Sequence, residues 1–346
     1  LHPDSTCVQL FVDPLMAALT KGYCTVATIM IDGRNLALQR GTGVATYARN
    51  LSYQLHELGH EVGVLYGHRR SAFVDSVLSE ILFFDDQPAP RHRYIEALDR
   101  TRDLLGNPFG YFARTVPVRG VVELQPLKQR LPYFDYLLNS PNLFRDAHAL
   151  YGILKVFRSV SSDLRPDVMH WTYPLPLRMK GVPNLYTMHD LVPLRLPYTT
   201  LDNKRHYLRL NRKIARKADL IVTISEHSKR DICDLLGVDE HRVFNTYQAV
   251  RIPDKYVNKP ADIVQREVEG TFGLDYKNYY LFWGSIEPKK NIHRMIEAYW
   301  ASRVEGPLVL LGASAWKSED ELRLLNDDHI RWLREDDKGD TRVKKR

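Results

Sequence analysis

The sequence has few cysteines and no long hydrophobic run. Its 346 residues include only three cysteines, Cys7, Cys24 and Cys233, which are far apart. This spacing fits neither a disulfide framework nor a metal site with paired ligands, and it favours a reducing compartment. No run approaches the roughly 18 to 20 apolar residues that a membrane span needs, so we expect a chain that does not cross a bilayer.

The sequence also lacks low-complexity tracts and a strong charge of one sign. Lys and Arg number 49 against 42 Asp and Glu, a net charge of +7, and 44% of residues are hydrophobic. Disordered and collagenous classes are excluded, and the length fits two domains. The charge permits anionic partners such as nucleotide-sugar phosphates or an anionic membrane surface, and it does not indicate nucleic acid. Residues 1–24 make a poor signal peptide and are interpreted as an upstream extension.

The first part of the chain has an α/β pattern. The apolar run 25–31 predicts a buried strand, residues 44–58 an amphipathic helix, and 62–66 a second strand. Such a unit predicts a parallel sheet with a right-handed crossover. Further strands are predicted at 168–171, 184–188, 220–225 and 243–246, and a helix at 202–217. Residues 69–145 show no clear pattern and are interpreted as a variable, acceptor-side region.

A second α/β unit follows a polar connection. A strand is predicted at 279–283, a loop at 284–291 and a helix at 292–302, with strands at 308–311 and 329–333. We therefore predict two domains, 25–255 and 256–346. Because a doubly wound domain has about five or six strands, the second domain is expected to be incomplete, with an exposed hydrophobic sheet face and poor solubility.

Two glycines open the first predicted helix. The exposed amides at a helix start near Gly41 and Gly43 favour a phosphate group. Equally, these glycines could serve only close helix packing. A dinucleotide fingerprint would need a third glycine where Thr46 stands and an acidic residue near Tyr66, so a nicotinamide-dependent oxidoreductase is a less favoured alternative.

Two further groups follow predicted strands at their carboxyl ends, where open α/β sheets bind ligands. Lys289 and Lys290 stand just before a helix whose amino end favours anions, although a solvated lysine pair would look the same. His189 and Asp190 come directly after the predicted strand 184–188. Isolated histidines mostly belong to cores or surfaces, but this location favours a functional role.

A basic helix and two acidic pairs complete the candidates. Charges on one face of the helix 202–217 could contact an anionic membrane or acceptor, although a solvated face is the commoner explanation. They are Arg205, Arg209, Arg212 and Arg216. The acidic pairs at 85–86 and 327–328 lack a neighbouring binding loop, so we predict no metal site.

With these motifs in order, residues 25–333 resemble the retaining sugar-nucleotide glycosyltransferases of glycosyltransferase family 4, which have the GT-B fold. The resemblance is carried by the segments 31–34 with 41–43, 187–193, 218–228 and 284–291. Within the family the sequence is most similar to mannosyltransferase-type enzymes that build bacterial surface polysaccharides, lipopolysaccharide among them.

The resemblance implies two Rossmann-like domains facing a cleft, with the acceptor bound mainly by the first and the nucleotide sugar mainly by the second. His189 would contact the donor sugar, and Lys290 would stabilise the departing phosphate, so no metal or cofactor is required. Donor phosphate contacts would come from Gly41, Gly43, Ser285, Lys289 and Lys290. Cleft positions would be Asp190, Glu287 and Asn291.

The predicted function is transfer of a hexose, with mannose from GDP-mannose as the suggested donor, to a glycan or lipid-linked acceptor with retention. We expect a cytoplasmic protein at the inner face of the membrane. Ser285 stands where many members have Arg, and Ala249 where relatives often have Gly.

The family's two glutamates separated by seven residues are not found in their loop. Glu297 and Glu305 have the spacing without that loop, and are interpreted as coincidence. A truncated or frameshifted end with impaired turnover is therefore expected, and a non-catalytic nucleotide-sugar-binding remnant is the alternative.

Overall fold

The structure is a computed structural model in which two compact units are distinguished. The first contains Leu1–Leu191 and Asn203–Arg251, and the second Val192–Asp202 and Ile252–Arg346. The residues that the structure describes are 26–36, 43–68, 80–81, 83–84, 110–124, 131–250, 252, 254–325, 334–335 and 341–342.

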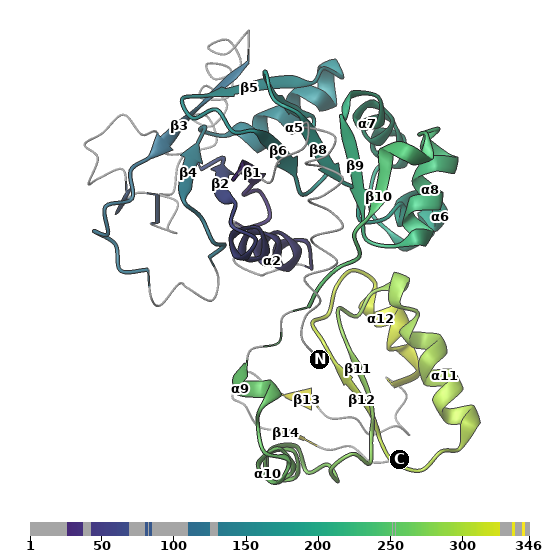
Figure 1. Ribbon diagram of the computed structural model, residues 1–346. Coiled ribbons are helices and arrows are strands. Elements are labelled where there is room, and N and C mark those ends of the chain that lie inside the picture. The colour runs from purple at the N-terminus through teal and green to yellow at the C-terminus, as the bar shows by residue number, and fades with distance from the viewer. Residues whose placement is uncertain are drawn as a thin grey trace, which may run out of the picture. The chain divides into compact units, whose positions relative to one another are not determined.

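The first unit is built on one ten-stranded sheet, in the order β10-β9-β8-β6-β1-β2-β4-β3-β5-β7 (Figure 1). All neighbouring strands run parallel except β3 and β4, which are antiparallel. The strands are β1 (Thr28–Asp32), β2 (Glu61–Tyr66), β3 (Tyr111–Val116), β4 (Tyr136–Asn139), β5 (Arg158–Ser162), β6 (Val168–Trp171), β7 (Leu177–Met179), β8 (Asn184–Thr187), β9 (Leu220–Thr223) and β10 (Val243–Asn245). The expected α/β class with a large parallel sheet is confirmed.

The helices of the first unit present apolar faces to this sheet. In α2, Tyr47, Leu51 and Leu55 recur on one side and join the core cluster of β1 and β2. The longer helices are α2 (Gly43–Glu57), α5 (Leu143–Leu154), α7 (Lys204–Lys217) and α8 (Glu226–Leu236), with the 3-10 turn η3 (Glu240–Arg242). The predicted helices at 44–58 and 202–217 are confirmed within two residues at each end.

The sequence pattern did not assign secondary structure to the region 69–145, and the structure places two strands of the sheet there. β3 alternates buried and exposed side chains and lies antiparallel to β4. Neither of these strands was predicted from the sequence. β5 and β7 were also missed, because β5 is polar and β7 has only three residues.

The strand order contains a topological switch point between β1 and β6. From β1 the chain proceeds to β2 and β4 on one side, then returns to β6, β8, β9 and β10 on the other. In open α/β sheets, ligands bind beyond the carboxyl ends of the strands at such a point. The ends of β1 and β6 are therefore where the fold itself locates a candidate site.

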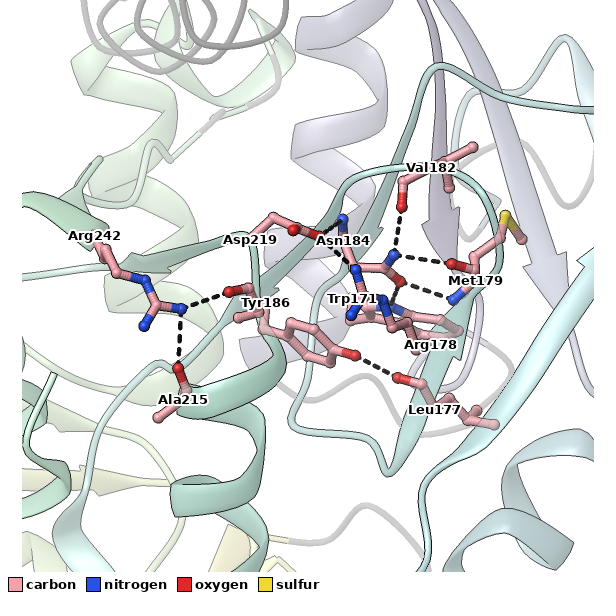
Figure 2. A network of polar contacts seen from close by, with 11 residues as sticks. Trp171, Leu177, Arg178, Met179, Val182, Asn184, Tyr186, Ala215, Asp219 and Arg242 are labelled. Carbon is pink, nitrogen blue, oxygen red and sulfur yellow. Dashed lines mark hydrogen bonds and ion pairs between the residues drawn. The ribbon is translucent and has the colours of Figure 1, made fainter.

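Asn184, the first residue of β8, links β6, β7 and β8 by hydrogen bonds (Figure 2). It lies at the amino end of β8, opposite the carboxyl edge of the sheet. Its Oδ1 accepts hydrogen bonds from Trp171 Nε1 at 2.9 Å and Met179 N at 2.8 Å, and its Nδ2 donates to the carbonyls of Met179 (3.0 Å) and Val182 (2.7 Å). Asp219 Oδ2 accepts from the Asn184 backbone N at 2.8 Å. Every polar atom of this buried amide is thus used.

The second unit has a small parallel pair, β11 (Tyr280–Trp283) and β12 (Leu308–Leu311). Both strands and the helix α11 (Ile292–Ser302) agree with the sequence prediction, whereas the predicted strand 329–333 lies outside the described residues. Other elements are α6 (Val192–Arg195), η2 (Pro197–Thr199), α9 (Asp254–Val257), α10 (Ala261–Phe272), η4 (Pro288–Lys290), α12 (Ser318–Glu321), η5 (Arg323–Leu325), β13 (Arg334–Glu335) and β14 (Thr341–Arg342).

The core of the second unit is thin. Ile286, Ile292 and Ile296 form its buried cluster, while Trp283 and Leu311 on the two strands are 73% and 62% exposed. The expected exposed hydrophobic face is confirmed for these strands. Searching the described residues for a membrane-spanning helix finds none of sufficient length and apolarity.

Candidate functional site

A buried carboxylate joins β1 and β6 at the switch point. Asp32 is the last residue of β1, and Thr172 directly follows β6. The Thr172 backbone N and its Oγ1 both donate to Asp32 Oδ2, the hydroxyl at 2.9 Å, while Arg34 N donates to Oδ1 at 3.3 Å. Burial raises the pKa of Asp32 to about 6, against the opposing effect of these hydrogen bonds.

His189 lies two residues beyond β8 and contacts the same junction. Its Nε2 is 3.0 Å from the carbonyl oxygen of Thr172. A carbonyl only accepts, so this contact assigns the proton to Nε2 and leaves the lone pair on Nδ1. Burial lowers the pKa of His189, which keeps the imidazole neutral at neutral pH. Asp32 therefore holds Thr172 in place, and the carbonyl of Thr172 in turn contacts His189.

Two other elements hold the His189 ring and backbone. The Tyr47 ring of α2 meets the imidazole edge-on, with centroids 4.9 Å apart, and Tyr47 Oη lies 3.1 Å from Thr187 Oγ1. Thr187 Oγ1 is in turn 2.7 Å from His170 Nε2. Burial lowers the pKa of His170 to about 3. Ser228 Oγ, in α8, donates to the His189 carbonyl at 3.0 Å. His189 is thus fixed by a polar network of buried or half-buried groups.

Gly43 begins α2, as the sequence predicts, whereas Gly41 lies outside the described residues. A Cβ built on Gly43 meets no described atom within 4 Å. Close packing against the described residues therefore does not explain this glycine. Asp190 is exposed, and its carbonyl accepts a hydrogen bond from Tyr207 Oη at 2.9 Å.

The lysine loop of the second unit follows β11. Ser285 Oγ donates to Glu287 Oε1 at 2.6 Å, and Lys289 Nζ is 3.2 Å from the same oxygen. Lys290 is exposed and makes no ion pair with the described residues. The two lysines are therefore not equivalent, because Glu287 neutralises Lys289 and leaves Lys290 as the available cation.

Two glycines and one residue in the left-handed backbone conformation shape this loop. A Cβ on Gly312, which follows β12, would lie 1.7 Å from the Gly284 carbonyl oxygen, so the two glycines permit a close approach that no side chain could share. Asn291 adopts φ 54° immediately before α11. Glu297 forms ion pairs with His293 and Arg294 on that helix.

Sequence reasoning singled out His189 and the lysine loop as candidates but not the residues that contact and position His189. Those are Asp32, Tyr47, His170, Thr172 and Thr187. The signal for Asp32 was present, since a carboxylate directly after an apolar β-branched run lies at the carboxyl end of a strand, where open α/β sheets bind ligands. Among the described residues, no three His, Cys, Asp or Glu side chains gather as metal ligands.

The comparisons with known proteins identify the family. The model described as Glycosyltransferase Family 4 matches residues 41–250, more than half of the chain and nearly all of the first unit's sheet. The chain therefore belongs to glycosyltransferase family 4.

A curated relative is the O-antigen chain mannosyltransferase B of Escherichia coli, 23% identical over 286 residues, which cover 80% of this chain and 62% of the relative. The chain thus spans about three fifths of the length of that relative. Among solved structures, HepE of Anabaena in complex with UDP matches with a TM-score of 0.42 and 12% identity, covering 87% of this chain and 64% of HepE. TarM matches with a TM-score of 0.45 and 10% identity, covering 89% and 75%.

Proposed function

We propose that the chain is a retaining hexosyltransferase that moves mannose from GDP-mannose to a glycan or lipid-linked acceptor of a bacterial surface polysaccharide. The observation that carries this proposal is the family-model match across the strands that hold His189 at the carboxyl edge. The mannosyltransferase name of the Escherichia coli relative supports the choice of sugar.

The proposed chemistry assigns His189 to the donor sugar. Cleavage of the bond between the anomeric carbon and the phosphate oxygen develops positive charge on the sugar and leaves the electron pair on the diphosphate. A neutral imidazole tolerates the first charge better than an imidazolium would. The low pKa of His189 and its fixed Nε2–H support this role.

Lys290 is assigned to the departing diphosphate. An exposed ammonium that is not already paired is suited to a charge that appears during the reaction. Among the described residues Lys290 has no ion-pair partner, whereas Lys289 pairs with Glu287. Gly43 would let the diphosphate approach the start of α2, where a Cβ meets no described atom within 4 Å. With these groups, no metal or cofactor is needed.

The cationic face of α7 supports a peripheral contact with an anionic membrane at the cytoplasmic face. Arg205, Arg209, Arg212 and Arg216 are exposed on this helix. Co-sedimentation with phosphatidylglycerol vesicles should fall when Arg205 and Arg209 are both changed to Gln, and binding that is indifferent to these changes would remove the membrane contact.

The test is turnover across a panel of donors. We expect the chain, given a lipid-linked saccharide extract as acceptor, to release nucleotide from GDP-mannose faster than from UDP-glucose or UDP-N-acetylglucosamine. The product's anomeric proton in NMR should show the donor's configuration. Nucleotide affinity without turnover of any donor would instead establish a binding-only protein, and an inverted product would contradict retention.

A further inference from the structure

A group of hydrogen-bond donors without acceptors lies next to the switch point, apart from His189. The buried atoms Asn35 Nδ2, Arg145 Nη2 and His148 Nε2 have no hydrogen-bond partner within the described part of the chain. All three are nitrogen atoms of side chains that can donate, and leaving a buried donor unpaired is costly. Three on two neighbouring elements call for a physical explanation.

The two elements meet at the carboxyl edge of the sheet. Asn35 belongs to the turn after β1, and Gly33 in that turn packs against Tyr66 at the end of β2. Gly67, which follows β2, packs against Phe144 in the first turn of α5. The turn after β1 and the start of α5 therefore border the same strand end.

The side chains on α5 share one side of the helix. Arg145 and His148 are three residues apart, and Tyr151 follows at the same interval. The Tyr151 ring contacts the ring of His206 in α7, with centroids 5.4 Å apart, and Lys213 Nζ lies 5.9 Å from its centroid. This face of α5 is thus lined by basic residues of α7.

The electrostatic surroundings of His148 are positive. After burial, which is the main cause, the charges of Arg34 and His206 both lower the pKa of His148, to about 4. One carboxylate is close by: Asp146 Oδ1 accepts from Arg145 Nε at 3.0 Å, which neutralises that pair and leaves Arg145 Nη2 unused. The donors without acceptors therefore lie beside the guanidinium of Arg34, whose charge favours an anion.

We propose that Arg34, Asn35, Arg145 and His148 bind a phosphate or diphosphate group carried by the acceptor. The proposal rests on the proposed transferase function, and it narrows the acceptor to a phosphorylated, diphosphate-linked glycan. A tetrahedral oxyanion supplies the several acceptors that these donors lack, and charge-assisted bonds to it are strong. The residues assigned above to the donor phosphates are different ones.

The first experiment is calorimetric titration with inorganic pyrophosphate in the presence of saturating GDP. We expect binding by the unaltered chain and at least about tenfold weaker binding by Arg34→Met and His148→Leu. Arg230→Met, which removes an exposed arginine of α8, is the matched control and should bind normally. Absence of pyrophosphate binding while GDP is saturating would overturn the proposal, because the anion site would then be missing or occupied by GDP.

The second experiment identifies the source of the phosphate. Transfer is compared between a synthetic saccharide linked to a diphosphate and the same saccharide as a neutral methyl glycoside. We expect a preference for the first that Arg34→Met abolishes. Equal use of both, with pyrophosphate still bound, would show a free-anion site and overturn the acceptor assignment. If no saccharide is a substrate, the transferase function fails while the pyrophosphate titration still decides the site.

Discussion

β8 and β11 are both parallel strands that precede a candidate functional residue, yet their surroundings differ. All four residues of β8 are buried, whereas Tyr280, Leu281 and Trp283 of β11 are 48%, 45% and 73% exposed. His189 after β8 is fixed by Thr172, Tyr47 and Ser228, while Lys290 after β11 makes no ion pair with described residues.

This contrast matches the chemistry assigned to each residue. A group that contacts the sugar must be preorganised, and a dense core provides the second layer of contacts for that. A cation that follows a leaving phosphate needs only a placed backbone and a free side chain. Changes within the first unit should therefore affect stability strongly, and changes on β11 should affect it little.

The largest effect is expected at Asn184. Asn184→Leu removes both side-chain acceptor and donor functions and leaves Trp171 Nε1 and the polar backbone atoms of Met179 and Val182 without a partner. We expect a loss of about 4 kcal/mol in the free energy of unfolding, measured by urea denaturation with circular dichroism. Asn258→Leu, at an exposed position, is the control and should change it by less than about 0.5 kcal/mol.

The next effect concerns pH and Asp32. Because its pKa is raised from 3.8 to about 6, the folded state binds the proton more tightly than the unfolded state. Stability from this group is present below about pH 4 and is lost as pH rises through 6. The difference between the unaltered chain and Asp32→Asn should shift by about 3 kcal/mol in favour of the variant from pH 4 to pH 8.

Carboxylates with lowered pKa values, such as Glu80, have the opposite pH dependence, but they are present in both proteins and cancel in the difference. A difference that stays flat between pH 4 and 8 would show that Asp32 is not a raised-pKa carboxyl. The sheet of the first unit would then lack the cost of burying a carboxylate, which distinguishes it from β11.

A smaller effect separates function from stability at Gly43. The methyl group of Gly43→Ala meets no described atom within 4 Å and the change improves helix propensity, so the free energy of unfolding should rise by up to about 1 kcal/mol. The added methyl group blocks the approach of a diphosphate, and kcat/KM should fall about tenfold, which corresponds to about 1.4 kcal/mol. Thermal unfolding and donor turnover measure the two effects, and an unchanged turnover would leave Gly43 a simple helix start.

The smallest effect is expected on β11. Trp283→Gln replaces a 73% exposed side chain, so the free energy of unfolding should change by less than about 0.5 kcal/mol. Solubility, measured as the protein concentration that remains after centrifugation, should increase because the exposed apolar face shrinks. A loss above 2 kcal/mol would mean that Trp283 is packed and would remove the contrast with β8.

The same contrast explains how far the sequence could predict the molecule. Strands with continuous apolar runs, such as β9 (LIVT) and β11 (YLFW), were predicted close to the observed residues because such runs are typical of parallel strands. β5, with sequence RSVSS, and the alternating β3 carry no such pattern, and their place in the sheet depends on distant partners. The region 69–145 was obscure for this reason.

The candidate site was predictable in part. His189 and Lys290 could be located because each follows a recognisable strand. Thr172 and Tyr47 could not, since their roles come from contacts across 17 and more than 100 residues of sequence, with His189 and Thr187 respectively. The different states of Lys289 and Lys290 depend on the conformation of Glu287, which spacing does not determine.

The most direct test of the account is donor turnover by His189→Ala and Lys290→Ala beside Lys289→Ala. We predict that GDP-mannose turnover falls about a hundredfold or more in the first two variants and less than about tenfold in the third. All three should keep the thermal unfolding profile of the unaltered chain. Equal losses in the two lysine variants, or full turnover in His189→Ala, would contradict the roles assigned to Lys290 and His189.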